Sequence, residues 1–166
     1  YTNFYLKPMN VLLIGDQFTG KTSFVERLIN NSFFESYITT IGKELHHYNY
    51  NGQKIFIHDC GGGDRYYSMI ELYFKTADGF IIFYNDEHKN IEKWTGMVPE
   101  TTPFILVKNG GKMDDIQDVH IDTKLNKNIQ KPIDLIVKKI PKKIIEEQTL
   151  MNLVFEYLMS FFPIFN

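Results

Sequence analysis

The sequence predicts an α/β fold in which helices cover both faces of a mostly parallel sheet. Strand-like runs alternate with helical segments along the chain, and the glycine-rich stretch Gly15–Ser23 stands between the apolar run Val11–Ile14 and an amphipathic segment. In addition, Asn51-Gly52 stands between two alternating runs, which is typical of an antiparallel hairpin. Ligands of parallel sheets bind beyond the carboxyl ends of the strands, so we expect a site among the loops at that edge.

The individual elements follow from local patterns. Strands are expected where apolar or alternating runs are bounded by turn residues: Phe4–Ile14 with Pro8 in its outer part, Glu44–Tyr50, Lys54–His58, Gly79–Tyr84, Phe104–Val107 and Pro132–Val137. Helices are expected from about Gly20 to Leu28, Tyr67 to Lys75, Lys89 to Met97 and Lys142 to Phe162, the last with Pro141 in its first turn. The polar region 112–131 has no clear period, and we place no long helix in it.

The composition limits the class of protein. A chain of 166 residues with 43% hydrophobic residues predicts one domain, residues 1–166. A net charge of −2 with both signs mixed argues against nucleic-acid binding, and a single cysteine favours a reducing, intracellular compartment. These residues hold no apolar run of transmembrane length and no C-terminal prenylation cysteine, so we expect neither kind of membrane attachment from them.

The glycine-rich stretch has the GxxxxGK[ST] pattern of a phosphate-binding loop. Its two glycines let backbone N–H groups turn inward toward phosphate oxygens, while Lys21 reaches the β- and γ-phosphates and Thr22 can ligate Mg²⁺. The following helix adds its positive end. The alternative is a structural turn without a ligand. The predicted phosphate-binding residues are Gly15, Asp16, Gln17, Phe18, Thr19, Gly20, Lys21, Thr22 and Ser23.

Residues further along the chain supply the other parts of a nucleotide site. Asp59 ends a strand, where it could hold Mg²⁺ directly or through water, and the N–H of Gly62 could meet the γ-phosphate. Thr40 lies on an exposed loop and could complete the Mg²⁺ shell together with Thr22. The alternatives are a solvated turn carboxylate and a surface threonine.

With these motifs the sequence resembles the Ras-like small GTPases, and the Rab family most closely. The matching stretches are Val11–Ser23, Tyr37–Gly42, Asp59–Gly62 and Arg65–Gly79. The resemblance implies a P-loop NTPase fold, a three-layer sandwich with a mostly parallel six-stranded sheet and one antiparallel hairpin strand. It also implies GTP or GDP with Mg²⁺ as cofactors, and a switch whose loops 32–42 and 60–72 contact protein partners.

The sequence departs from the family at the positions that matter for hydrolysis. Gly63 stands where relatives carry the glutamine that positions the attacking water. Gln17 and Phe18 replace residues that are small in most relatives, which crowds the space over the β–γ bridge. We therefore predict slow or absent hydrolysis, unless a partner supplies the missing groups.

The base-reading motifs are also altered. In Asn109-Gly110-Gly111-Lys112 only the asparagine of the family's N-K-x-D motif remains, and a cationic Lys112 cannot accept the guanine protons that an aspartate would. A register slipped by two residues, ending at Asp114, keeps the lysine and aspartate but loses the asparagine; the spacing from the preceding strand favours the first. Lys138 is assigned to the family's S-A-K loop. Guanine selectivity is accordingly expected to be weak.

The cysteine and three of the histidines have plain interpretations. Cys60 is expected to be a quiet buried thiol. His46 and His47 point to opposite faces of a strand, which argues against a metal that they share. His58 stands where relatives often carry tryptophan, and this change disfavours ordinary Rab effectors.

Two functions compete at this point. One is an active Rab-like switch in membrane or intraflagellar trafficking. The other, which we favour, is a nucleotide-stabilised subunit of a larger assembly with impaired hydrolysis. The predicted closing helix supports the second, because its apolar residues cover more surface than packing on a sheet requires, so that face is expected to bind a protein partner.

Overall fold

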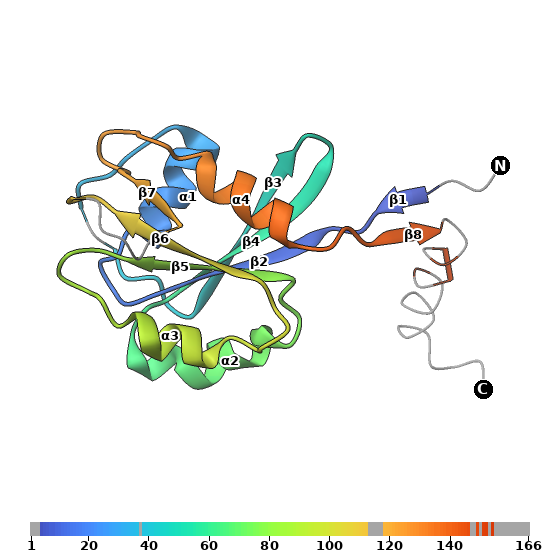
Figure 1. Ribbon diagram of the computed structural model, residues 1–166, viewed down its shortest axis with the longest axis horizontal. Coiled ribbons are helices and arrows are strands. Elements are labelled where there is room, and N and C mark those ends of the chain that lie inside the picture. Colours follow the sequence, from blue (N-terminus) through green and yellow to red (C-terminus); the bar gives the residue numbers. More distant parts are fainter. Residues whose placement is uncertain are drawn as a thin grey trace.

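The computed structural model describes residues 4–36, 38–112 and 118–146, together with residues 149, 151, 152 and 154. These residues form a three-layer α/β sandwich, in which a central sheet separates two pairs of helices (Figure 1). The predicted fold is therefore confirmed. That the whole chain forms one domain stays a prediction.

The central sheet has six strands in the order β3-β4-β2-β5-β6-β7. Only β3 runs antiparallel, paired with β4 through the turn at Asn51 and Gly52. The predicted hairpin is thus confirmed. The strands are β2 (Met9–Ile14), β3 (Lys43–Tyr50), β4 (Gln53–Cys60), β5 (Gly79–Tyr84), β6 (Phe104–Asn109) and β7 (Val119–Ile121).

Two helices pack on each face of the sheet. Helices α1 (Lys21–Asn30) and α4 (Lys131–Lys139) cover one face, and α2 (Tyr67–Phe74), preceded by the 3-10 turn η1 (Asp64–Tyr66), covers the other together with α3 (Ile91–Met97). Every residue of β5 is buried, as its unbroken apolar run predicted. Among the described residues no helix is long and apolar enough to cross a membrane.

The prediction of a strand at Pro132–Val137 is wrong, because these residues lie in helix α4. Pro132 occupies the first turn of the helix, where its missing N–H costs nothing. Ile133, Ile136 and Ile140 recur at helical spacing and are all buried against the sheet. The sixth strand is instead β7, which lies within the polar region 112–131, where no strand was predicted.

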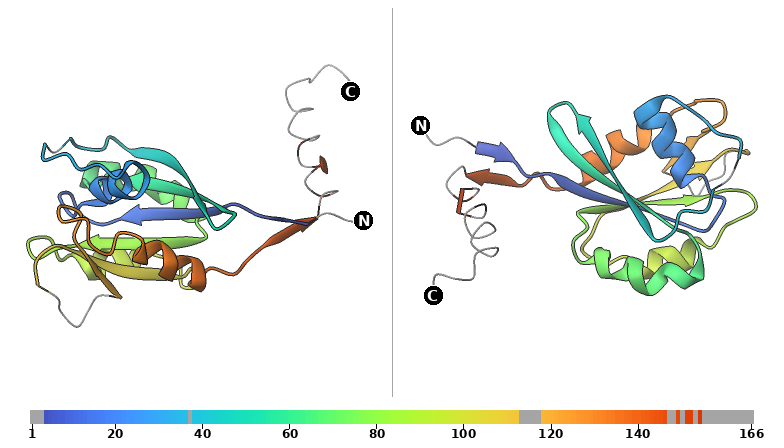
Figure 2. Two further views of the ribbon diagram at one scale, coloured as in Figure 1. Left: turned by 90° about the horizontal axis from the view of Figure 1, so that it is seen from above. Right: turned by 180° about the vertical axis from the view of Figure 1, so that it is seen from behind.

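The ends of the described chain form a separate two-stranded ribbon that extends away from the sandwich (Figure 2). In it, β1 (Phe4–Leu6) pairs antiparallel with β8 (Ile144–Glu146). The predicted strand Phe4–Ile14 is therefore two strands, interrupted at Lys7 and Pro8. The predicted helix from Lys142 to Phe162 is wrong at 144–146, where β-branched residues pair with β1; residues 149, 151, 152 and 154 are helical, and the rest of that prediction lies outside the described residues.

Candidate functional site

The loop between β2 and α1 has the backbone of a phosphate cradle. Gly15 and Gly20 both have positive φ angles, 137° and 87°, which favour glycine. A Cβ on Gly15 would overlap the carbonyl of Phe83, and one on Gly20 would overlap the side-chain amide of Asn109. Both glycines are therefore required by close contacts as well as by backbone conformation.

The Lys21 amine is held over this loop by hydrogen bonds to carbonyl groups of the loop backbone. Nζ donates to the carbonyl oxygens of Gly15 at 2.8 Å and Asp16 at 2.7 Å, and the side chain is almost fully buried. Burial lowers the pKa of Lys21 to about 8, and the Asp59 carboxylate offsets this only in part. A buried cation of this kind is stabilised by an anion placed beside it.

The loop is also fixed from outside. Asp16 accepts hydrogen bonds from Trp94 Nε1 at 2.9 Å and Asn90 Nδ2 at 2.7 Å, which ties the loop to α3. Phe18 is half exposed, lies next to His88 with ring centroids 5.9 Å apart, and its carbonyl accepts from Asn85. The loop is thus held in place by contacts on both sides.

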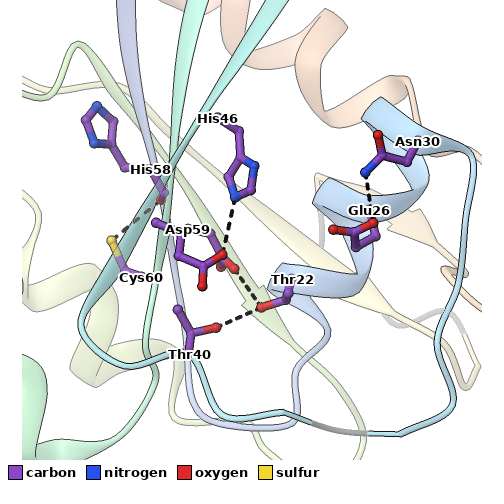
Figure 3. Close-up of polar contacts among 9 residues, drawn as sticks. Thr22, Glu26, Asn30, Thr40, His46, His58, Asp59 and Cys60 are labelled. Atoms are coloured by element: carbon purple, nitrogen blue, oxygen red, sulfur yellow. Dashed lines mark hydrogen bonds and ion pairs between the residues drawn. The ribbon is translucent and has the colours of Figure 1, made fainter.

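The three predicted metal-binding residues lie together (Figure 3). Thr22 Oγ1 donates to Asp59 Oδ2 at 2.6 Å and lies 3.0 Å from Thr40 Oγ1. Asp59 is fully buried, and its other oxygen, Oδ1, has no hydrogen-bond partner among the described residues. Burial raises the pKa of Asp59, against the lowering effect of the bond from Thr22. Two hydroxyls and a carboxylate oxygen are ligands that suit Mg²⁺.

A pocket of about 500 Å³ opens beside these groups, and its size is typical of a small-molecule site. Residues of the phosphate loop, the 33–40 segment and the start of β3 line it: Phe18, Gly20, Lys21, Thr22, Ser23, Glu26, Phe33, Phe34, Glu35, Ser36, Ile38, Thr39, Thr40, Glu44, Cys60 and Gly62.

The loop after β4 lies directly against the phosphate loop. A Cβ on Gly62 would overlap the backbone of Asp16 and Gln17, so the position predicted to meet the γ-phosphate admits no side chain. A Cβ on Gly63 would lie 2.8 Å from Nε2 of Gln17. The end of the Gln17 side chain therefore lies next to Gly63, and it would have to move aside if residue 63 carried a side chain.

Asn109 links the base end of the site to the phosphate loop. Its Nδ2 donates to the Thr19 carbonyl at 3.1 Å, and its Oδ1 accepts from the backbone N–H of Thr123 at 3.1 Å. This placement agrees with the register that starts at Asn109, whereas Asp114 of the slipped register lies outside the described residues. Sequence reasoning missed Thr123, although the alternation of Val119-His120-Ile121 before it was a usable strand signal.

The residues that follow Asn109 in this loop offer few groups that could recognise a base. Gly110 and Gly111 both have positive φ angles, 72° and 65°, and Lys112 is exposed. A Cβ on Gly111 would overlap the carboxylate of Asp86, which also pairs with buried Lys108 at 2.7 Å. The Asp86 carboxylate beside this loop is therefore already paired with Lys108.

Lys138 does not lie on a loop that follows the last strand, as the sequence assignment required. It is an exposed residue in the last turn of α4, and that end of the helix points toward the β1–β8 ribbon (Figure 1). The loop that meets Asn109 is instead 122–125, directly after β7.

The other singled-out residues are structural. Cys60 is a buried free cysteine, and burial raises the pKa of its thiol to about 12, as expected of a quiet thiol. His58 is bridged between Asn10 Oδ1 and Lys43 Nζ, each 3.0 Å from a ring nitrogen. Burial and the Lys43 charge lower the pKa of His58 to about 4, so the ring is neutral near pH 7.

Comparisons with known proteins agree with this geometry. Residues 10–114 match the family described as Roc, the Ras of Complex domain of DAPkinase. The chain belongs to the Ras-like small GTPases. This Ras-like chain is 29% identical over 139 residues to the GTP-binding nuclear protein Ran of Giardia intestinalis, and 28% identical over 119 residues to the Ras-related protein Rab-7b of Bos taurus.

The matches with the two relatives cover 68% and 64% of this chain, and 61% and 60% of the relatives. A Ras and EF-hand domain-containing protein homolog of Caenorhabditis briggsae is 32% identical over 120 residues, which cover 65% of the chain but 19% of the relative. The Ras-like chain therefore spans less than two thirds of the length of each of these relatives.

Proposed function

We propose that this Ras-like domain binds GTP or GDP with Mg²⁺, hydrolyses the nucleotide slowly or not at all, and serves as a nucleotide-stabilised subunit of a larger assembly. The observation that carries the proposal is that buried Lys21, Thr22 and Thr40 line one pocket, and that both Thr40 and buried Asp59 contact the Thr22 hydroxyl. Lys21 and the loop N–H groups would hold the phosphates, and the two threonines and Asp59 would hold Mg²⁺. The bound ion would neutralise phosphate charge.

Slow hydrolysis is supported by the contact between Gln17 and Gly63. Glycine offers no group to orient a water, and Gln17 fills the space next to it from the phosphate loop. Weak base discrimination is supported by Gly110 and Lys112, which offer neither a side chain over the ring nor an acceptor for its protons.

A role in an assembly is supported by exposed apolar side chains around the two loops predicted to contact partners. Ile38, Ile41 and Leu72 are 80%, 78% and 73% exposed. The methyl end of Met69 on α2 lies against Gly42, so the two loops share one surface. Exposed apolar groups gathered in this way are typical of protein interfaces. We place this assembly in a reducing compartment, in keeping with the free cysteine Cys60.

One observation favours the second candidate, an active switch. The contact between Thr22 and Thr40 links the 38–42 segment to the metal-binding residues, so loss of a bound nucleotide phosphate would release that segment. Hydrogen exchange with GDP and with a non-hydrolysable GTP analogue separates the two functions. A subunit predicts equal protection of 32–42 and 60–72 in both states, whereas a switch predicts protection that depends on the nucleotide.

The nucleotide proposal is tested by denaturing the purified protein and analysing the released small molecules by chromatography. We expect close to one nucleotide per chain. Absence of nucleotide, together with no calorimetric signal for GTP, GDP or ATP in Mg²⁺, would contradict it.

A further inference from the structure

The β3–β4 hairpin brings three metal-binding side chains together at the edge of the pocket. Glu44 and Asp59 are direct partners in the antiparallel register, and His46 follows Glu44 by two residues and so shares its face of the strand. One ligand atom from each of the three lies within 4.8 Å of the other two. In Figure 3 the dashed line from His46 marks its ion-pair contact with the Glu44 carboxylate, which is drawn beside Asp59.

Two of these ligand atoms are buried and have no hydrogen-bond partner among the described residues. They are Nε2 of His46 and Oδ1 of Asp59. His46 Nε2 lies 3.8 Å from the Glu44 carboxylate, too far for a hydrogen bond. Leaving buried polar atoms unsatisfied is costly, and buried acceptors that converge in this way indicate a shared positively charged ligand.

The geometry points to a second metal site: we propose that Glu44, His46 and Asp59 bind one divalent transition-metal ion of the Zn²⁺ class. A ring nitrogen with two carboxylates is a donor set that suits Zn²⁺ and its neighbours, whereas Mg²⁺ takes oxygen ligands. Ligand atoms around a four-coordinate Zn²⁺ lie about 3.3 Å apart, a spacing that small side-chain rotations reach from the observed positions. A water completes the shell on the open side, where Glu44 is 59% exposed.

This second site and the Mg²⁺ residues use different oxygens of one carboxylate. Asp59 Oδ2 accepts from Thr22, and Oδ1 has no partner among the described residues, which leaves it available to the second ion. The ion would therefore stabilise the start of β3, next to Gly42 and the 38–41 segment. It would not displace Thr22 from its hydrogen bond with Asp59. His47 takes no part, because it lies on the other face of β3, where its ring centroid is 4.9 Å from that of Phe56.

The test is a titration of the purified, chelator-treated protein, with whatever nucleotide it retains and without free nucleotide. Zn²⁺ is followed by calorimetry and Co²⁺ by its d–d absorption. We expect one ion per chain and a tetrahedral Co²⁺ spectrum. His46→Ala and Glu44→Gln should each weaken binding by at least about tenfold, and His47→Ala should leave it unchanged.

Thermal melts without metal check that each variant is folded. Glu44→Gln changes an exposed side chain, so weaker metal binding in this variant does not depend on packing at His46. Nucleotide content is measured in the same samples, so failure of the metal site is distinguishable from failure of the nucleotide site. Wild type without a stoichiometric site, equal affinity in His46→Ala, or loss of binding in His47→Ala alone would overturn the proposal.

Discussion

At the phosphate end of the site, Lys21 donates to the carbonyls of its loop and Thr22 donates to buried Asp59, whereas at the base end Gly110 has no side chain and Lys112 is exposed. Both ends keep their backbone framework, since Asn109 still links the two loops. The backbone framework at the base end is therefore kept although only the asparagine of the family's N-K-x-D motif remains there. Affinity and selectivity are then carried by different residues, and can be tested separately.

The largest expected effect lies at the phosphate end. Lys21→Ala should abolish nucleotide binding, a loss of at least about a hundredfold in affinity, because it removes a buried charged donor. Nucleotide content after purification and calorimetry measure it. The control is Lys138→Ala, which removes an exposed lysine from α4. Equal loss of nucleotide binding in both variants, or retained binding in Lys21→Ala, would contradict the role proposed for Lys21.

At the base end a single substitution should add selectivity. Lys112→Asp introduces an acceptor for the guanine N1 and N2 protons, which should raise the preference for GTP over ATP by about tenfold or more. Competition binding with the two nucleotides measures the ratio. Lys142→Asp, the same charge change at an exposed position after α4, should leave the ratio unchanged. An unchanged ratio in Lys112→Asp would mean that Lys112 does not face the base.

Hydrolysis should respond to two substitutions together and to neither alone. Gly63→Gln by itself meets the Gln17 carboxamide, so we expect its rate to stay at the slow wild-type value, below an ordinary intrinsic rate of about 10⁻⁴ s⁻¹. Gln17→Gly with Gly63→Gln clears that space and should accelerate phosphate release about tenfold over wild type. Single-turnover assays measure the rate of phosphate release. Fast hydrolysis by the wild type would contradict the assignment of Gln17 and Gly63.

The smallest effect is a pH dependence that belongs to the phosphate end. A phosphate anion binds the protonated amine, and the pKa of Lys21 before binding is about 8. Affinity should therefore be flat below about pH 8 and fall by up to about tenfold per pH unit above it, because the amine must first regain its proton. Lys21→Arg, which stays charged, should show a weaker site without this fall.

The parts predicted from sequence were those carried by contiguous residues. The phosphate loop, the Asn51-Gly52 hairpin and the buried strand β5 each depend on neighbours in the chain, and the structure has them where the sequence placed them. Thr22, Thr40 and Asp59 also meet, because Thr22 lies in the first turn of α1, Asp59 near the end of β4 and Thr40 shortly before β3, and the sheet determines the positions of these elements.

The incorrect or missing predictions concern residues whose structural role depends on contacts with residues far away in the sequence. Ile133, Ile136, Val137 and Ile140 have helical spacing, whereas the apolar content of Pro132–Val137 predicts a strand. The assignment of Lys138 to the S-A-K loop depends on that strand and is wrong with it. Pro141 follows the end of α4 rather than starting a helix, as proline commonly does. The contact of Gln17 with Gly63, and the cluster of Glu44, His46 and Asp59, arise from packing between loops and strands that sequence spacing does not encode.

The central claim is that this Ras-like domain holds its nucleotide by the phosphates and reads the base weakly. Competition of GTP against ATP for the nucleotide-free protein in Mg²⁺ tests it most directly. The account predicts that both bind, with GTP favoured by less than about a hundredfold, as expected where no buried polar group of the site is left unpaired by the wrong base. A preference above about ten thousandfold, or binding of neither nucleotide, would contradict it.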